Sequence, residues 1–169
     1  FAATDWHPGN HPPMPEVVAR GRKPDVFACG WCHRADGAGG PENANLMGLP
    51  YAYFVQQMKD FRSGDRKTSI ATRAPTALMI AGSKTMSDAE LDETARYFSS
   101  LKPRTRLRVV ETALVPKTIV HGWVLVDTGT GEKEPIGQRI IEVPENPADF
   151  ESRDSRARFI VYAPPGSVS

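Results

Sequence analysis

The sequence predicts a mainly α-helical fold over about residues 16–102, followed by a small β-rich C-terminal segment over 103–169. In the first part, apolar residues recur at three- and four-residue steps, which is the period of an amphipathic helix. After Pro103 the chain becomes rich in β-branched residues separated by turn sequences, which is typical of short strands. A length of 169 residues permits one domain with a substantial extension.

Residues 1–15 are predicted to form an extended, proline-rich arm, because five of them are proline or glycine. His7 and His11 lie four residues apart, a spacing that would suit a metal site on a helix. The prolines exclude a helix there, so we interpret the arm as a surface or partner-contact segment. Residues 16–28 are expected to hold a short helix that Pro24 makes irregular.

A longer helix is predicted over residues 51–61, where one apolar stripe recurs at helical spacing. Gly64 is expected to end this helix. The stretch that follows, residues 65–86, is predicted to be mostly irregular. The side chains of the stripe are Tyr51, Phe54, Val55, Met58 and Phe61.

The clearest helix signal covers residues 87–101. Ser87 and Glu90 have the spacing of a capping box, in which each side chain bonds the other residue's backbone N–H. Met86 and Leu91 fit the hydrophobic staple that often flanks such a box. The sequence therefore predicts a well-defined start for this helix.

Strands are predicted in the C-terminal segment, where β-branched stretches alternate with turn sequences. Turns are expected at 127–131, which contains two glycines, and at 144–147, which contains two prolines. No catalytic constellation is apparent there, and we interpret His121 as an ordinary strand residue. The predicted strands are 106–112, 118–127, 139–143 and 158–162.

The most informative motif is Cys29-Gly30-Trp31-Cys32-His33, which holds both cysteines of the chain. C-x-x-C-H is the attachment sequence for c-type haem. Two thiols three positions apart reach the two vinyl groups of one porphyrin and become thioethers, and the following histidine can ligate the iron. The motif therefore predicts one covalently bound haem c, with Cys29 and Cys32 as attachment points and His33 as an axial ligand.

Other interpretations of the two cysteines fit the sequence less well. A disulfide between residues three apart closes too short a loop to stabilise much, and it needs no histidine. A thioredoxin-like pair lies in a βαβ unit, whereas no strand–helix alternation surrounds this motif. A zinc site needs more ligands than the sequence offers in this pattern. The glycine-rich loop after the motif, residues 35–41, lacks the phosphate-binding pattern and is expected to fold closely around a flat cofactor.

The second axial ligand of the haem iron is predicted to be Met79. A methionine there is usual for an electron carrier and raises the potential. Met58 and Met86 have packing roles in the predicted helices, Met14 lies in the arm, and Met47 follows the glycine loop closely. Met79 lies in the predicted irregular stretch, where a loop can carry its sulfur over the haem face. Met47 and His121 remain alternatives.

The net charge, the apolar runs and the N-terminal sequence indicate where the protein works and what it does not bind. A net charge of +1 gives no indication of nucleic-acid binding. No apolar run approaches the ~20 residues that span a bilayer. The N-terminus lacks the basic start and apolar stretch of a signal peptide. Because haem is attached to such motifs outside the bacterial cytoplasm, we expect a periplasmic or otherwise exported protein in its mature form.

In its first hundred residues the chain resembles class I c-type cytochromes, especially the cytochrome c4-like branch. The resemblance implies the cytochrome c fold for residues 16–102 and a ligand methionine at Met79, before the Ser-Asp helix start. It also implies that the Pro41 carbonyl accepts the other ring N–H of His33. Arg34 stands where the family usually has glycine. The resemblance rests on C-G-W-C-H at 29–33, D-G-A-G at 36–39, L-M-G-L-P at 46–50, residues 53–66, Met79, and M-S-D-A-E-L at 86–91.

Residues 104–169 do not match that fold and resemble the segment after the first haem module in some two-haem bacterial cytochromes. The stretches 134–144 and 163–167 carry this resemblance. In such proteins a second C-x-x-C-H module follows, which leaves open a second haem domain beyond residue 169.

Together these observations predict an electron carrier rather than an enzyme, or an electron-transfer module of a larger oxidoreductase. Its partners would be a redox donor and acceptor that the sequence does not identify. Tyr53 and Arg66 are candidate contacts for the haem propionates. The alternative is a catalytic or ligand-sensing haem with an open sixth coordination site, and a thiol-redox protein without haem is a weaker third possibility.

Overall fold

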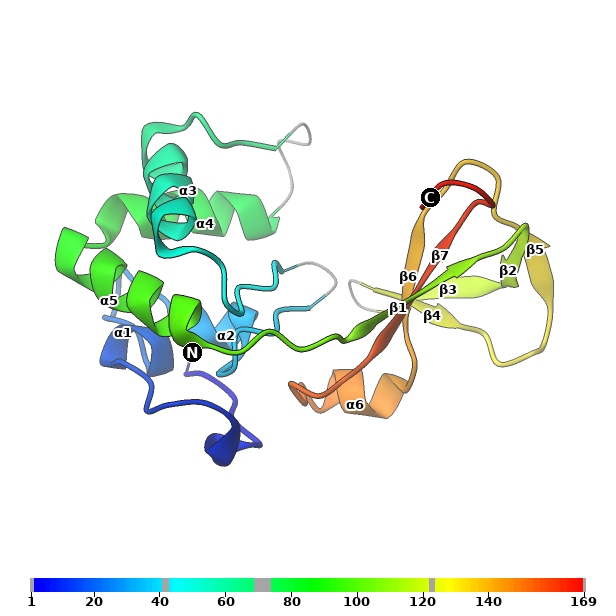
Figure 1. The fold of residues 1–169 in the computed structure, drawn as a ribbon, viewed down its shortest axis with the longest axis horizontal. Coiled ribbons are helices and arrows are strands. Elements are labelled where there is room, and N and C mark those ends of the chain that lie inside the picture. Colours follow the sequence, from blue (N-terminus) through cyan, green and yellow to red (C-terminus); the bar gives the residue numbers. More distant parts are fainter. Residues whose placement is uncertain (1, 41–42, 69–73, 122–123, 169) are drawn as a thin grey trace. The chain divides into compact units, whose positions relative to one another are not determined.

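The chain divides into two compact units, residues 1–104 and 105–169. The computed structural model describes residues 2–40, 43–68, 74–121 and 124–168. Figure 1 shows helices in the first unit, and mainly strands in the second. The change from helix to strand therefore falls where the composition changes, near the predicted division at residue 103.

The first unit is built from helices around α5. In Figure 1, α3 and α4 lie on one side of α5 and α1 on the other, and both α3 and α1 contact α5. The short α2 carries the cysteine motif. The helices are α1 (Glu16–Ala19), α2 (Cys29–His33), α3 (Tyr51–Ser63), α4 (Ala74–Thr85) and α5 (Asp88–Ser100).

The two clearest helix predictions are confirmed, together with their end signals. Gly64 follows α3 with a φ of 88°, a left-handed conformation that glycine adopts without steric cost, and its N–H bonds the Asp60 carbonyl. Before α5, the Ser87 side chain accepts from the Glu90 N–H and the Glu90 carboxylate accepts from the Ser87 N–H. This is the predicted capping box.

The prediction that residues 65–86 are mostly irregular is wrong for the second half of that stretch. Residues 74–85 form α4, so Met79 lies within a helix and not in a loop. Pro75 is tolerated because it stands in the first turn, where its missing N–H has no helical partner. The alanine, leucine and methionine that follow are strong helix formers.

The core of the first unit centres on Phe98, which is completely buried. The Phe54 ring of α3 stacks on it at a centroid distance of 5.9 Å. Three further residues of α5, Leu91, Ala95 and Tyr97, belong to the same buried cluster. The apolar faces read from the sequence therefore do meet in one core, which α3 and α5 share with α1 through Val17 and Val18.

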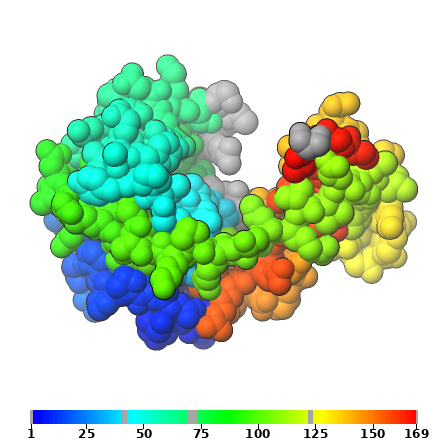
Figure 2. Space-filling view, in the orientation of Figure 1, coloured from blue at the N-terminus to red at the C-terminus, as the bar shows by residue number. Residues whose placement is uncertain are grey.

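The N-terminal arm packs onto the first unit. It contains one turn of 3-10 helix, Pro8–Asn10, and the Ala3 N–H bonds the Ala19 carbonyl at the end of α1. The His11 side chain is only 5% exposed and lies 3.2 Å from the Asp5 carboxylate. Figure 2 shows the arm, in blue, as part of the surface of this unit. His11 therefore takes part in the packing of this unit.

The second unit contains a three-stranded sheet in the order β1-β7-β6. Strand β1 runs parallel to β7, with Leu107 opposite Phe159, and β6 runs antiparallel to β7. Two further strand pairs, β2 with β5 and β3 with β4, are antiparallel. The strands are β1 (Leu107–Glu111), β2 (Leu114–Pro116), β3 (Thr118–His121), β4 (Val124–Asp127), β5 (Lys133–Pro135), β6 (Ile141–Pro144) and β7 (Phe159–Ala163).

Two predictions for this unit are corrected by the structure. The single strand predicted over 118–127 is instead two antiparallel strands, with His121 of β3 opposite Val124 of β4. The sequence places Gly122, a weak strand former, between the two β-branched stretches. The turn predicted at 144–147 runs into a helix, α6 (Pro147–Glu151), because the Asn146 side chain accepts from the Ala148 N–H and caps it.

Candidate functional site

The cysteine motif forms one turn of helix, so Cys29 and Cys32 lie on one face of α2 (Cys29–His33). Both cysteine side chains are half-buried. The Cys29 sulfur lies 4.0 Å from the Thr94 hydroxyl of α5. Burial raises the pKa of the Cys29 thiol to about 11. At neutral pH this thiol is therefore protonated, and it lies at the junction of α2 with the core.

His33 ends the same helix with its ring held in one orientation. Its Nδ1 lies 2.8 Å from the Ala44 carbonyl oxygen. A carbonyl can only accept, so Nδ1 carries the proton and the lone pair is on Nε2. Burial lowers the pKa of His33 and so favours the neutral imidazole. A neutral ring with one nitrogen bonded to the backbone is the usual form of a metal-ligating histidine.

The acceptor of this histidine bond is positioned by the glycine loop. Gly39 has a φ of +67°, and a Cβ there would overlap the Asn43 and Ala44 carbonyl oxygens. The Gly39 N–H also bonds the His33 carbonyl at 2.9 Å. Glycine is therefore required for the chain around Ala44 to come close enough to His33. Pro41, the acceptor that the family resemblance implies, lies outside the described residues.

Arg34, directly after the motif, is a buried residue with an unusual backbone. Its φ is 67° and its ψ is 160°, a conformation that essentially only glycine adopts without strain. Its Nε donates a long bond of 3.4 Å to the Gly39 carbonyl. This backbone geometry favours glycine, the residue that the family resemblance leads one to expect at this position.

The structure sorts the methionines by their packing. Met47, Met58 and Met86 are buried in the core of the first unit, with exposures of 5%, 6% and 7%. Met14 and Met79 are half-buried and pack against that core from its edge. Met79 of α4 and Cys29 of α2 therefore pack against the same buried cluster.

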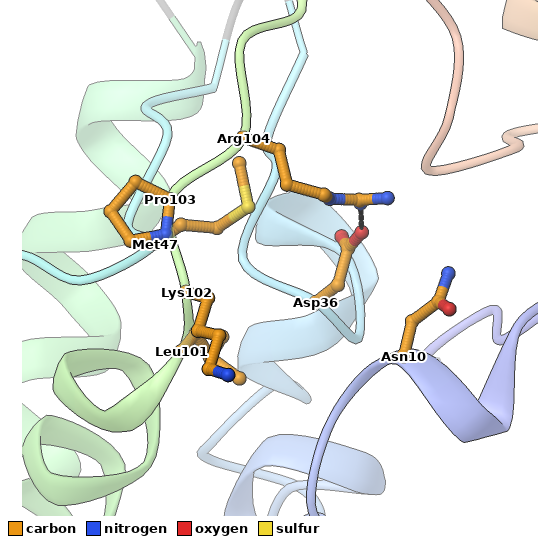
Figure 3. Close-up of a pocket in the computed structure, with 7 residues that line it drawn as sticks. All are labelled: Asn10, Asp36, Met47, Leu101, Lys102, Pro103 and Arg104. Carbon is orange, nitrogen blue, oxygen red and sulfur yellow. Dashed lines mark hydrogen bonds and ion pairs between the residues drawn. The ribbon is translucent and has the colours of Figure 1, made fainter.

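Met47 has a packing role of its own. It lines a pocket of about 380 Å³ together with Leu101, Pro103 and Arg104. Figure 3 shows its side chain beside Pro103 and Arg104. Arg104 forms an ion pair with the buried Asp36 in the same pocket. Met47 is nevertheless 5% exposed and belongs to the buried cluster of the first unit, so core packing accounts for it.

The remaining predicted residues lie on the surface or in the other unit. Tyr53 of α3 is 47% exposed. The Arg66 guanidinium lies over the Phe61 ring, 5.0 Å from its centroid. His121, in β3 of the second unit, is exposed and lies 3.0 Å from the Glu151 carboxylate. The structure thus brings together Cys29, Cys32 and His33, and gives Tyr53, Arg66 and His121 surface positions.

Sequence reasoning missed two residues at this site. Ala44 contributes a backbone carbonyl, for which its side chain gives no signal. Thr94 is 1% exposed and donates its hydroxyl proton to the Glu90 carbonyl at 2.7 Å. It stands three residues after Leu91 on the inner face of α5, so the helical period could have placed it among the buried residues.

A protein-family model for cytochrome c matches residues 18–102. This match covers half of the chain and includes α2 with its cysteine motif, α3, α4 and α5. The chain therefore belongs to the cytochrome c family of electron-transfer proteins, and its first unit has the cytochrome c fold. Membership in this family implies covalently bound haem c.

Individual relatives point to the same family. A thiosulfate dehydrogenase electron acceptor from Thiomonas intermedia (strain K12) is 34% identical over 82 residues, which are 47% of this chain and 34% of that protein. Cytochrome c4 from Azotobacter vinelandii is 29% identical over 115 residues, 65% of this chain and 55% of that protein. The chain thus spans about a third to about half of the length of these relatives.

Two solved structures are also similar in part. Cytochrome c4 from Acidithiobacillus ferrooxidans is 29% identical, with a TM-score of 0.43 over 51% of this chain and 46% of that one. A thiosulfate dehydrogenase from Marichromatium purpuratum is 26% identical, with a TM-score of 0.46 over 56% of this chain and 19% of that one.

The residues present fit the haem that the family implies. Two thiols share one helical face, and the adjacent imidazole has its Nδ1 hydrogen-bonded to the Ala44 carbonyl, so Nε2 carries no proton.

Among the helices that the structure describes, none has the length and apolar character needed to cross a membrane.

Proposed function

We propose that this chain is an electron carrier with one haem c, attached to Cys29 and Cys32 and ligated axially by His33 and Met79. The observation that carries the proposal is the 2.8 Å contact between His33 Nδ1 and the Ala44 carbonyl. This bond fixes the tautomer and orients the ring, as in other metal-ligating histidines. When bound, the haem supplies a one-electron couple between Fe(II) and Fe(III).

The protein's own contribution is to keep both axial ligands in place. Burial lowers the pKa of His33, which favours the neutral ring whose Nε2 lone pair can bind the iron. Packing of the first unit around Phe98 and Phe54 excludes water, which tunes the potential. Ligands that stay bound in both oxidation states limit the structural change on electron transfer.

Met79 is the best candidate for the iron ligand, because the other methionines have packing roles or lie in the arm. Met47, Met58 and Met86 have at least 93% of their surface covered in the core, and Met14 belongs to the arm. Met79 is half-buried, packs on the same core as Cys29, and stands before the Ser-Asp start of α5 as in the related cytochromes. A thioether ligand raises the potential of the iron.

The test of this ligation is Met79→Ala, with Met47→Leu as the matched control. We expect Met79→Ala to lose the sulfur-to-iron charge-transfer absorption of the ferric protein, to lower the potential, and to let carbon monoxide bind the reduced protein rapidly. Met47→Leu conserves volume and is expected to keep all three properties. Rapid carbon monoxide binding to the wild type would instead favour a haem with an open sixth site.

The setting follows from the attachment chemistry. Haem is joined to C-x-x-C-H motifs outside the bacterial cytoplasm, so we place the working protein in the periplasm or another exported location. Its partners are a redox donor and a redox acceptor, a role for which the similarity to a thiosulfate dehydrogenase electron acceptor gives support. A second haem domain beyond residue 169 stays a prediction.

A further inference from the structure

Two arginines from outside α4 donate hydrogen bonds to backbone carbonyls at its C-terminal end. Arg62 of α3 donates from Nε to the Ser83 carbonyl and from Nη2 to the Met86 carbonyl, both at 2.9 Å. Arg22, which precedes the cysteine motif, donates from Nη2 to the Thr85 carbonyl at 2.9 Å. The last carbonyls of a helix have no partners within it, so these bonds satisfy acceptors that the helix leaves open.

Each arginine also joins α4 to the start of α5. Arg62 Nη1 lies 2.7 Å from the Asp88 carboxylate, and Arg22 Nε lies 2.8 Å from the Glu90 carboxylate. Both acidic residues stand in the first turn of α5. The guanidinium groups therefore fix the α4–α5 junction to α3 on one side and to the segment before α2 on the other.

The same junction has a third attachment to the segment that leads to the motif. The Thr85 hydroxyl donates to the Asp25 carbonyl at 3.0 Å. Ser83, one turn beyond Met79, is 1% exposed, and its hydroxyl bonds the Ile80 carbonyl within the helix. Four helical residues span about 6 Å, so a shift of the bonded end would be transmitted to Met79 through a rigid turn.

From this geometry we propose that Arg62 and Arg22 are positioning residues that hold Met79 at the haem iron by bonding the C-terminal end of α4. This inference rests on the proposed ligation by Met79. Among the described residues, neither arginine forms a hydrogen bond or ion pair with His33 or Met79, so both act through the helix.

Arg62 is expected to position α4 through its hydrogen bonds to the backbone carbonyls and not through its ion pair with Asp88. Asp88 is 91% exposed, and an ion pair so open to solvent contributes little. The two carbonyls need donors in a fixed planar arrangement, which a guanidinium provides and a lysine ammonium does not. Lysine should therefore replace Arg62 poorly although it keeps the charge.

The experiment measures the rate at which imidazole binds the ferric holoprotein, because imidazole displaces a methionine only when the sulfur leaves the iron. We expect Arg62→Gln, which removes two charge-assisted bonds to backbone carbonyls, to raise this rate by at least about tenfold. Arg62→Lys should behave like Arg62→Gln. Asp88→Asn, which leaves both carbonyl bonds intact, should change the rate less than about twofold.

Arg96→Gln is the matched control. Arg96 bonds Asp92 on its own helix at 2.8 Å and its side chain is 70% exposed, and its guanidinium lies over the Tyr51 ring. None of these contacts reaches α4, so the rate should stay at the wild-type value. Arg22→Gln should raise the rate less than Arg62→Gln, because Arg22 bonds one backbone carbonyl at the α4–α5 junction, that of Thr85, whereas Arg62 bonds two, those of Ser83 and Met86.

Two outcomes would overturn the inference and are distinguishable. If Met79→Ala keeps the sulfur-to-iron absorption, Met79 is not the ligand, and the positioning role falls with the ligation. If Met79→Ala loses that absorption but Arg62→Gln binds imidazole at the rate of Arg96→Gln, the ligation stands and the arginine role alone is refuted.

Discussion

The helical unit (residues 1–104) and the strand unit (residues 105–169) differ in how far apart in the sequence their interacting residues lie. Helix α5 begins with a bond pair between Ser87 and Glu90, three residues apart. Strand β1 instead pairs with β7, which places Leu107 beside Phe159. Local patterns therefore describe the first unit well, whereas the pairing of the second depends on residues that are remote in the sequence.

The substitutions with the largest expected effect test whether the two units have separate hydrophobic cores. Phe98 in the first unit and Phe159 in the second are 0% and 1% exposed. Replacing either by alanine should lower the free energy of unfolding of its own unit by about 3–5 kcal/mol. Hydrogen exchange followed by mass spectrometry, read separately on peptides from 1–104 and 105–169, assigns the loss of protection to a unit.

If the comparison holds, Phe159→Ala leaves the protection of the helical unit and the haem absorption unchanged. Equal loss of protection in both units from either variant would show that they unfold as one cooperative structure.

A smaller effect is expected at Arg34, where the helical unit departs from its own family's pattern. Its φ of 67° and ψ of 160° favour glycine. Arg34→Gly and Arg34→Ala both remove the guanidinium, so their difference reports the backbone alone. We expect the glycine variant to be more stable by about 1–3 kcal/mol in thermal or denaturant unfolding, the reverse of the usual order.

Arg153 offers the corresponding position in the strand unit, with a φ of 60°. The same pair of substitutions there should also favour glycine. An alanine variant at Arg34 as stable as the glycine variant would mean that the backbone relaxes without cost.

The smallest effect concerns acid stability. The hydrogen bond from Arg22 holds the pKa of Glu90 below its usual value. A lowered pKa in the folded state stabilises the protein above the ordinary pKa of a glutamate, and this contribution is lost as the pH falls below it. Glu90→Gln should therefore lower stability by about 1 kcal/mol at neutral pH and flatten the loss of stability on acidification.

Glu93→Gln on the same helix is the control, because Glu93 lies on the exposed face of α5. The pH dependence of unfolding, measured for both variants, checks the assignment. An acid limb as steep in Glu90→Gln as in the wild type would contradict it.

The sequence predicted those parts of the fold whose causes lie within one helical turn. The capping box at Ser87 and the glycine stop at Gly64 are such cases, and both are confirmed. Helix α4 was missed because Pro75 indicates a break unless its position in the first turn is known. The division into β3 and β4 was missed because one weak strand former, Gly122, does not by itself end a β-branched stretch.

The candidate site was predictable where side-chain chemistry identifies it. Cys29, Cys32 and His33 carry their own signal in their spacing. The Ala44 carbonyl could not be found, since a backbone acceptor leaves no trace in the residue type. The arginines that bond the end of α4 were equally hidden, because Arg62 and Met86 meet only through the packing of α3 against α4.

The reduced pyridine haemochrome spectrum of natively matured protein tests the central claim most directly. The account predicts a c-type α band and haem that survives acid–acetone extraction, as two thioether bonds to Cys29 and Cys32 require. Mature protein without a haem signal, or haem that is extracted by acid–acetone, would contradict covalent attachment and with it the proposed electron carrier.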